Sequence, residues 1–166
     1  MSKPHKFEGY HVGVAAEGFA AGLLAQAGYD VLVQYGANQP LYDLAAIKGD
    51  RALKVSVKGT TEVAWGITGK LKSGRSYAEA TEVWLQKHGK DLVFLFVQFH
   101  DTTLGKMPRV YVARSSEVAA HLNKVKCREG DTTLWENHTW TKGKAKNSTD
   151  KIPELWKFSQ DRIDSV

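Results

Sequence analysis

Residues 42–59, YDLAAIKGDRALKVSVKG, decide the fold of this chain. Apolar and polar residues alternate on both sides of Gly49-Asp50, and a period of two is the pattern of a half-buried strand. We therefore predict two neighbouring strands, over 41–47 and 51–58, with a tight turn between them.

The two faces of the second strand differ in character. One face of this strand is apolar and consists of Leu53, Val55 and Val57. The other face is polar and consists of Lys54, Ser56 and Lys58. The first strand carries one acidic residue, Asp43, among leucine and isoleucine side chains. A carboxylate in an apolar strand, beside a strand that ends in a lysine, is costly unless the two groups pair or perform a function.

The length and composition of the chain indicate one globular domain over 1–166. The chain has 166 residues, 42% of them hydrophobic and 25% charged, which is ordinary for a protein with a sizeable core. No apolar run reaches membrane-spanning length, and residues 1–6 contain no apolar signal region, so we expect a cytoplasmic protein without a membrane partner. The single cysteine excludes an intramolecular disulfide and a cysteine-based zinc site. The formal net charge of +5 favours a polyanionic partner.

The pattern predicts a helix over 11–28, closed by Gly28 and followed by a strand over 30–36. Its apolar stripe is formed by Val14, Ala20, Ala21, Leu24 and Ala27. A turn-like connection over 37–40 then leads to the two central strands. Glu17 lies near the stripe, either as a solvated carboxylate or as a group held against the sheet.

Beyond the central strands we predict a short strand within 61–67, a basic loop, and a helix over 76–89. Ser76 and Glu79 stand in capping-box register at the start of that helix. A near-continuous apolar run over 91–99 predicts a buried strand. A strand over 109–113 and a short helix capped by Ser115 or Ser116 follow.

The core therefore spans about 8–125, and residues 126–166 form a polar, irregular extension with isolated tryptophans and a last helix over 153–163. The order of elements predicts an α/β sandwich with a mixed central sheet of about five strands flanked by helices.

Three short motifs, AEG at 16–18, YDL at 42–44 and SVKG at 56–59, resemble the PD-(D/E)XK nuclease superfamily, which includes restriction endonucleases and Holliday-junction resolvases. The resemblance covers roughly residues 8–125. It implies a restriction-endonuclease-like fold with catalytic positions at Glu17, Asp43, Ser56 and Lys58.

The resemblance also implies a cofactor, Mg²⁺ or Mn²⁺. Asp43 is expected as the main metal ligand, with the Val57 carbonyl as a second ligand and Glu17 acting through water or on a second metal. Lys58 is expected to orient the attacking water or to stabilise the developing phosphorane charge.

Ser56 departs from the family pattern, which usually has Asp or Glu at this position and has Gln or another polar residue in some branches. One fewer carboxylate weakens metal binding. Three readings stay open: Glu17 compensates, another carboxylate such as Glu62 or Asp50 replaces the missing one, or the site is inactive.

The expected partner is DNA, duplex or branched, contacted by Thr60 and by the basic loop residues Lys70, Lys72 and Arg75. That loop is alternatively an ordinary solvated one. We expect a homodimer or higher oligomer, because two strands of a duplex require two cuts.

The predicted function is a Mg²⁺-dependent DNA endonuclease that hydrolyses phosphodiester bonds. One alternative is a catalytically inactive nuclease-like domain that binds nucleic acid. The other is a protein-interaction domain in which the pair Asp43 and Lys58 is structural.

Overall fold

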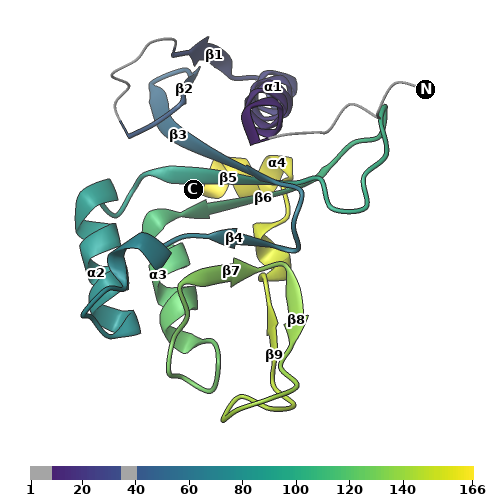
Figure 1. The fold of residues 1–166 in the computed structure, drawn as a ribbon. Coiled ribbons are helices and arrows are strands. Elements are labelled where there is room, and N and C mark those ends of the chain that lie inside the picture. The colour runs from purple at the N-terminus through teal and green to yellow at the C-terminus, as the bar shows by residue number, and fades with distance from the viewer. Residues whose placement is uncertain (1–8, 35–40) are drawn as a thin grey trace.

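The computed structural model describes residues 9–34 and 41–166 (Figure 1). The predicted turn over 37–40, the end of the predicted strand 30–36 and the N-terminal residues 1–6 lie outside the described residues. The helices are α1 (Gly9–Gln26), α2 (Tyr77–His88), α3 (Ser115–Lys124) and α4 (Gln160–Ser165), with short 3₁₀ turns η1 (Gly69–Leu71) and η2 (Glu154–Trp156). The strands are β1 (Asp30–Val33), β2 (Leu44–Lys48), β3 (Arg51–Thr60), β4 (Ala64–Gly66), β5 (Val93–Gln98), β6 (Arg109–Arg114), β7 (Thr133–Trp135), β8 (Asn137–Thr139) and β9 (Thr149–Lys151).

The central sheet has five strands in the order β1-β2-β3-β5-β6. Strands β3 and β5 are parallel, and the other neighbours are antiparallel. The two residues of the predicted turn, Gly49 and Asp50, join β2 to β3, and Gly49 has a φ of 61°, which glycine adopts without strain. The predicted mixed five-stranded sandwich is confirmed.

Each face of the sheet has its own apolar core. On one face, Val55 and Val57 of β3 and Leu95 of β5 pack with α1 and with Ile163 of α4. On the other face, the core contains aromatic residues of β4, α2, β5 and β6 together with α3 and η2. The alternation in β3 thus separates its apolar face, under α1, from the face that carries Lys54, Ser56 and Lys58.

Helix α1 packs very closely on β3. Its buried stripe is formed by Val12, Ala16, Ala20, Leu24 and Ala27. The prediction that Val14 belongs to this stripe was wrong, since its side chain is 53% exposed. A Cβ added at Gly59 would lie 2.7 Å from the Ala16 Cβ and 3.0 Å from the Val12 carbonyl oxygen, so the glycine permits the contact.

Helix α2 begins as predicted. The backbone N–H of Glu79 donates to Ser76 Oγ (3.2 Å), and the N–H of Ser76 donates to Glu79 Oε2 (2.7 Å). Helix α3 differs from the prediction, because its N-cap is Arg114, whose N–H donates to Glu117 Oε2 (2.7 Å). Ser115 is buried and its hydroxyl donates to the Gly89 carbonyl.

The C-terminal region is more ordered than predicted. Strand β7 pairs with β4, and β8 pairs with β9. These three-residue strands are too short to show an alternating pattern, and each is fixed by a partner distant in sequence. Trp135 stacks on His138 with ring centroids 4.1 Å apart, and Trp156 is buried.

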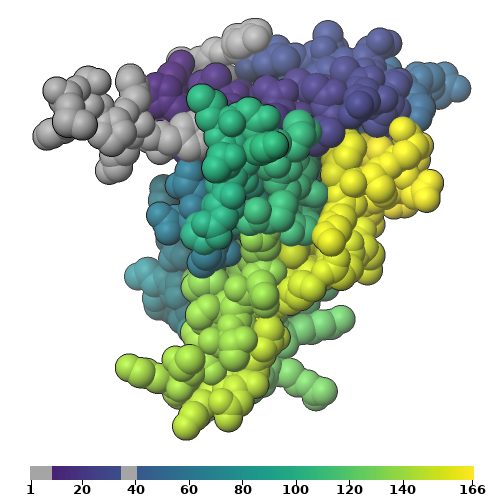
Figure 2. Space-filling view, turned by 90° about the vertical axis from the view of Figure 1, so that its right-hand side faces the viewer, coloured from purple at the N-terminus to yellow at the C-terminus, as the bar shows by residue number. Residues whose placement is uncertain are grey.

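The last helix also starts later than predicted. Pro153 precedes η2, and the α-helix α4 spans only Gln160–Ser165. Figure 2 shows this C-terminal segment in yellow along the side of the molecule, between the small strands and α1.

Candidate active site

The site is built around Asp43, at the point where β2 begins. Asp43 directly precedes β2, so the prediction that it lies within the strand was wrong by one residue. Its N–H donates to the Val55 carbonyl (2.8 Å), and its carbonyl accepts from the Gln34 N–H (3.1 Å). These two bonds fix the Asp43 backbone between β1 and β3.

The Asp43 carboxylate takes the place of a strand partner for β3. Its Oδ2 accepts from the Val57 N–H (2.6 Å) and from the Ser56 hydroxyl (3.2 Å). Charge-assisted bonds of this kind hold a carboxylate in one orientation. Among the described residues, no donor bonds to the other oxygen, Oδ1, which is therefore free for a ligand.

The Val57 carbonyl points toward the same side as this carboxylate. In a strand, the N–H and C=O of one residue point to the same edge, and the Val57 N–H faces Asp43. A backbone carbonyl and a carboxylate therefore meet at the end of the β2–β3 pairing.

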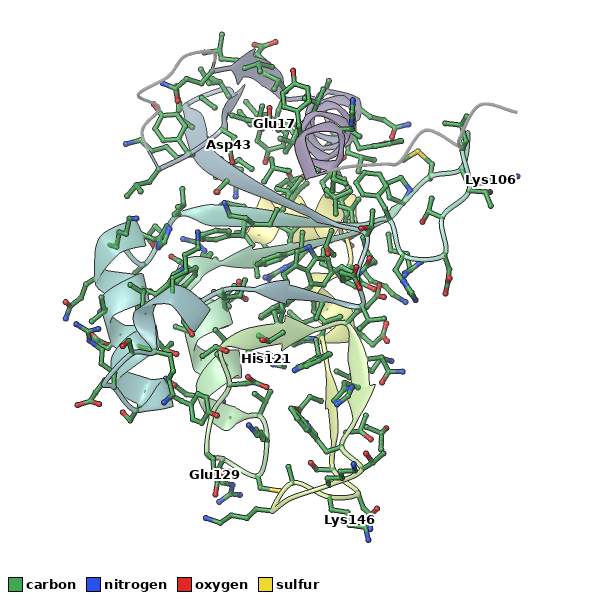
Figure 3. All side chains as sticks on the ribbon, in the orientation of Figure 1. Glu17, Asp43, Lys106, His121, Glu129 and Lys146 are labelled. Carbon is green, nitrogen blue, oxygen red and sulfur yellow. The ribbon has the colours of Figure 1, made fainter. Side chains whose placement is uncertain are left out.

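Glu17 of α1 and Asp43 lie in the same region of the molecule (Figure 3), and the Asp43 charge acts on Glu17. Glu17 follows Ala16, the residue in closest approach to Gly59, so the tight packing of α1 sets its position. Burial raises the pKa of Glu17, the Asp43 carboxylate raises it further, and the Lys58 ammonium opposes both. The charges of Asp43 and Lys58 therefore both act on Glu17.

Lys58 is exposed, and its main chain is fixed by the Trp65 indole, which donates to the Lys58 carbonyl (2.9 Å). No ion pair joins Asp43 to Lys58 within residues 9–34 and 41–166, so the structural salt bridge considered from the sequence is absent there. The ammonium is therefore free to meet an anionic ligand.

The described chain offers two carboxylates here and no more. No group of three or more Asp, Glu, His or Cys side chains suited to a metal occurs in it, so neither Glu62 nor Asp50 replaces the acidic residue missing at Ser56. Ser56 is buried, at 3% exposure, and serves Asp43 as a hydrogen-bond donor. Mg²⁺ takes one or two carboxylates and keeps several waters, so this donor set fits such an ion.

The predicted DNA contacts divide into two groups. Thr60 lies two residues beyond Lys58 on β3, and its Oγ1 accepts from the Glu62 N–H (3.1 Å). Lys70, Lys72 and Arg75 lie at and after η1, before the first turn of α2.

The basic loop adjoins the first turn of α2, whereas His88 lies in the last turn, about 18 Å away along a helix of this length. Within the loop, Lys72 Nζ donates to the Arg75 carbonyl (2.7 Å) and lies over the Tyr77 ring (4.7 Å). Hydrogen bonds thus join Asp43 to Ser56 and Val57, and the charges of Asp43 and Lys58 act on Glu17, whereas the basic loop adjoins the start of α2.

A cavity of about 730 Å³ adjoins the site. Tyr42, Lys54 and His88 line it, and no sequence motif links them, because they come from three separate parts of the chain. The one indication of this cavity in the sequence is the alternation of β3, which places Lys54 on the same face as Lys58.

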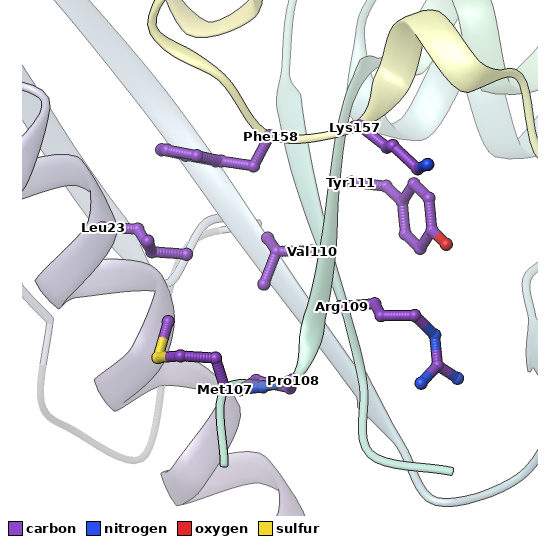
Figure 4. A pocket seen from close by; sticks show the side chains of 8 residues that line it. All are labelled: Leu23, Met107, Pro108, Arg109, Val110, Tyr111, Lys157 and Phe158. Atoms are coloured by element: carbon purple, nitrogen blue, oxygen red, sulfur yellow. The ribbon is translucent and has the colours of Figure 1, made fainter. Parts of the chain in front are cut away.

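A second cavity, of about 270 Å³, lies between α1 and β6 (Figure 4). Leu23, Met107, Val110 and Phe158 form its apolar wall, and its lining residues include no carboxylate. It carries none of the chemistry of the Asp43 site.

None of the helices described is long and apolar enough to cross a membrane. No protein-family model matches the sequence, and no curated protein matches it significantly.

Two solved structures with a similar fold are nucleases by name. Hjc, a Holliday junction resolvase of the archaeal hyperthermophile Archaeoglobus fulgidus, is 16% identical, with a TM-score of 0.43 over 75% of this chain and 88% of its own. A bacterial homing endonuclease is 15% identical, with a TM-score of 0.46 over 90% of this chain and 86% of its own. At this level of identity the likeness concerns the fold alone.

Proposed function

We propose that this chain is a divalent-metal-dependent endodeoxyribonuclease that hydrolyses phosphodiester bonds. One observation carries the proposal: Ser56 and Val57 of β3 hold the Asp43 carboxylate, and this carboxylate and Lys58 of the same strand both act electrostatically on Glu17 of α1. A pair of carboxylates with a free ammonium suits the binding of a cation and the stabilisation of a phosphate in the same place.

Asp43 and Glu17 would hold the metal, with the Val57 carbonyl as a third donor. When bound at these residues, the metal would supply a coordinated water of lowered pKa and positive charge for the phosphoryl oxygens. The Ser56 hydroxyl and the Val57 N–H hold Asp43 Oδ2, so that Oδ1 stays directed at the ligand.

Lys58 supplies the positive charge of the site. Its exposed ammonium orients the attacking water or stabilises the charge that develops on the phosphoryl oxygens. Thr60, further along the same face of β3, contacts the neighbouring phosphate.

DNA is the proposed substrate, and the net charge of +5 supports binding to a polyanion. Lys70, Lys72 and Arg75 contact the duplex backbone at a distance from the cleaved bond. A homodimer supplies the second cut that a duplex requires.

One observation favours a second candidate function, which is DNA binding without cleavage. Position 56 holds a serine that bonds to Asp43, and the described chain has no third acidic ligand to replace it. In that case the same basic face binds DNA and the metal affinity is too low for turnover.

Plasmid and branched DNA cleavage in Mg²⁺ or Mn²⁺ separates the two functions. Cleavage by the wild-type chain, lost in Asp43→Ala and in Lys58→Ala, supports the nuclease. DNA binding that weakens steeply with salt, without any metal-dependent cleavage, supports the second candidate. If the chain neither binds nor cleaves DNA, both candidate functions are contradicted.

A further inference from the structure

The cavity of about 730 Å³ opens beside the candidate site, between the first half of β3 and the corner where α2 leads into β5. Two of its lining residues connect it to the site. Tyr42 precedes Asp43 in the chain, and the Lys58 charge acts on His88. The cavity therefore neighbours the proposed position of the cleaved phosphate.

Two rings line the cavity, those of Tyr42 and His88. His88 is held in place, because its Nδ1 bonds to the Trp84 carbonyl (2.8 Å) and its ring packs on Trp84, with centroids 4.6 Å apart. Leu53 and Leu92 add apolar surface. A planar base stacks favourably on a wall of this composition.

The cations of the cavity are of two kinds. The Arg51 guanidinium donates to backbone carbonyls of the α4 region, and Arg114 pairs with Asp91 (3.0 Å). Lys54 and Lys90 have no carboxylate partner within the described residues, and Lys54 Nζ lies over the Tyr42 ring (5.5 Å). Two ammonium groups thus remain for the phosphates of a ligand.

We propose that this cavity binds an unpaired nucleotide of the DNA strand next to the cleaved phosphate. Its base stacks against Tyr42 and His88, and its phosphates meet Lys54 and Lys90. The inference rests on the proposed function for the position of the cleaved bond. A volume of this size is typical of sites for small molecules, whereas a base inside an intact duplex is stacked and cannot enter.

This arrangement defines a class of substrate. DNA with unpaired nucleotides beside the cutting point, such as an overhang or a flap, gains a stacking contact that a blunt duplex lacks. One such contact corresponds to roughly a fivefold or greater gain in affinity.

The test is the affinity of the full chain, in buffer with a metal chelator, for a labelled blunt duplex and for the same duplex with a single-stranded overhang. We expect tighter binding of the overhang by the wild type, and loss of this preference in His88→Ala and in the double variant Lys54→Ala/Lys90→Ala. Lys87→Ala is the matched control, since this exposed lysine of α2 does not line the cavity. Melting curves check that each variant is folded. The double variant is the safer test of the cavity, because it replaces two exposed lysines and leaves the packed His88 ring in place.

Equal binding of both DNAs by the wild type, or a preference that survives the double variant, would overturn the inference. Because the chelator removes the metal, the result is independent of cleavage. A preference without Mg²⁺-dependent cleavage supports the cavity and overturns only the nuclease. Cleavage without a preference overturns only the cavity.

Discussion

The Ser56 hydroxyl donates a hydrogen bond to Asp43 Oδ2 across 3.2 Å. In the proposed function, Ser56 would thus orient the metal ligand Asp43 rather than bind the metal itself. The remaining oxygen, Asp43 Oδ1, accepts no bond from the described residues. The properties of this site therefore depend on how well Ser56 and the Val57 N–H hold one carboxylate.

Removing the Ser56 hydroxyl tests this support directly. We predict that Ser56→Ala lowers Mg²⁺ affinity by roughly 10- to 100-fold, the usual effect of losing a group that orients a metal ligand. Isothermal titration calorimetry measures the change. Ser56→Thr, which keeps the hydroxyl, is expected to retain most of the affinity, and equal affinity in Ser56→Ala and wild type would contradict the role.

Adding a carboxylate at the same position is the complementary change. We predict that Ser56→Glu binds Mg²⁺ more tightly and cleaves DNA faster, because a third anionic ligand faces the cation. The same titration and a plasmid assay measure both effects. Weaker or unchanged metal binding in a folded Ser56→Glu protein would show that position 56 does not face the metal.

The contact between Gly59 and Ala16 sets the position of Glu17. A Cβ at Gly59 would lie 2.7 Å from the Ala16 Cβ, so we predict that Gly59→Ala pushes α1 away from the sheet and lowers the free energy of unfolding by about 1–3 kcal/mol. It also weakens Mg²⁺ binding, since Glu17 moves with α1. Urea denaturation and calorimetry measure the two effects.

The matched control is Gly66→Ala on β4, where an added Cβ meets nothing within 4 Å. We expect little change in stability or metal binding there. A Gly59→Ala protein as stable as the control would mean that the helix does not depend on this close approach.

The raised pKa of Glu17 has a consequence for stability without metal. Burial and the nearby Asp43 raise this pKa, and Lys58 opposes them. The folded protein therefore gains stability from protonated Glu17 at a pH below the unfolded pKa, and this gain is lost as the pH rises through the folded pKa. We predict that Glu17→Gln raises the Tm at neutral pH by about 1–3 °C. This gain shrinks as the pH falls and Glu17 becomes protonated.

Magnesium reverses the sign of this effect. An ionised Glu17 binds the cation, so Mg²⁺ raises the Tm of the wild type more than that of Glu17→Gln. Metal binding to the wild type weakens as pH falls through the raised pKa of Glu17. Thermal shift curves over a pH series, with and without Mg²⁺, measure both effects, and a Tm difference independent of pH and metal would contradict them.

Much of the framework could be predicted because its signals are local. The alternation around Gly49-Asp50 predicts the β2–β3 hairpin, and Ser76 with Glu79 predicts the start of α2. The apolar run over 91–99 predicts β5, which is buried on both faces. Glu17, Asp43 and Lys58 were predicted together from motifs that resemble a family, and in the fold the charges of Asp43 and Lys58 act on Glu17; their joint role stays a prediction.

What could not be predicted depends on distant partners. Val14 matches a helical stripe as well as Val12 does, and only the approach of α1 to Gly59 selects Val12. The short strands β7, β8 and β9 exist because of pairing across the fold. The cavity beside the site combines residues of separate elements, so no motif in the sequence indicates it.

The most direct test of the central claim is the cleavage of supercoiled plasmid DNA in Mg²⁺ by the wild type, Asp43→Asn and Lys58→Ala at equal concentration. If the two carboxylates and the lysine form a nuclease site, the wild type cleaves, and each variant is slower by on the order of 10²-fold or more while it stays folded. Cleavage at the wild-type rate by either folded variant, or its complete absence from the wild type in both Mg²⁺ and Mn²⁺, would contradict the account.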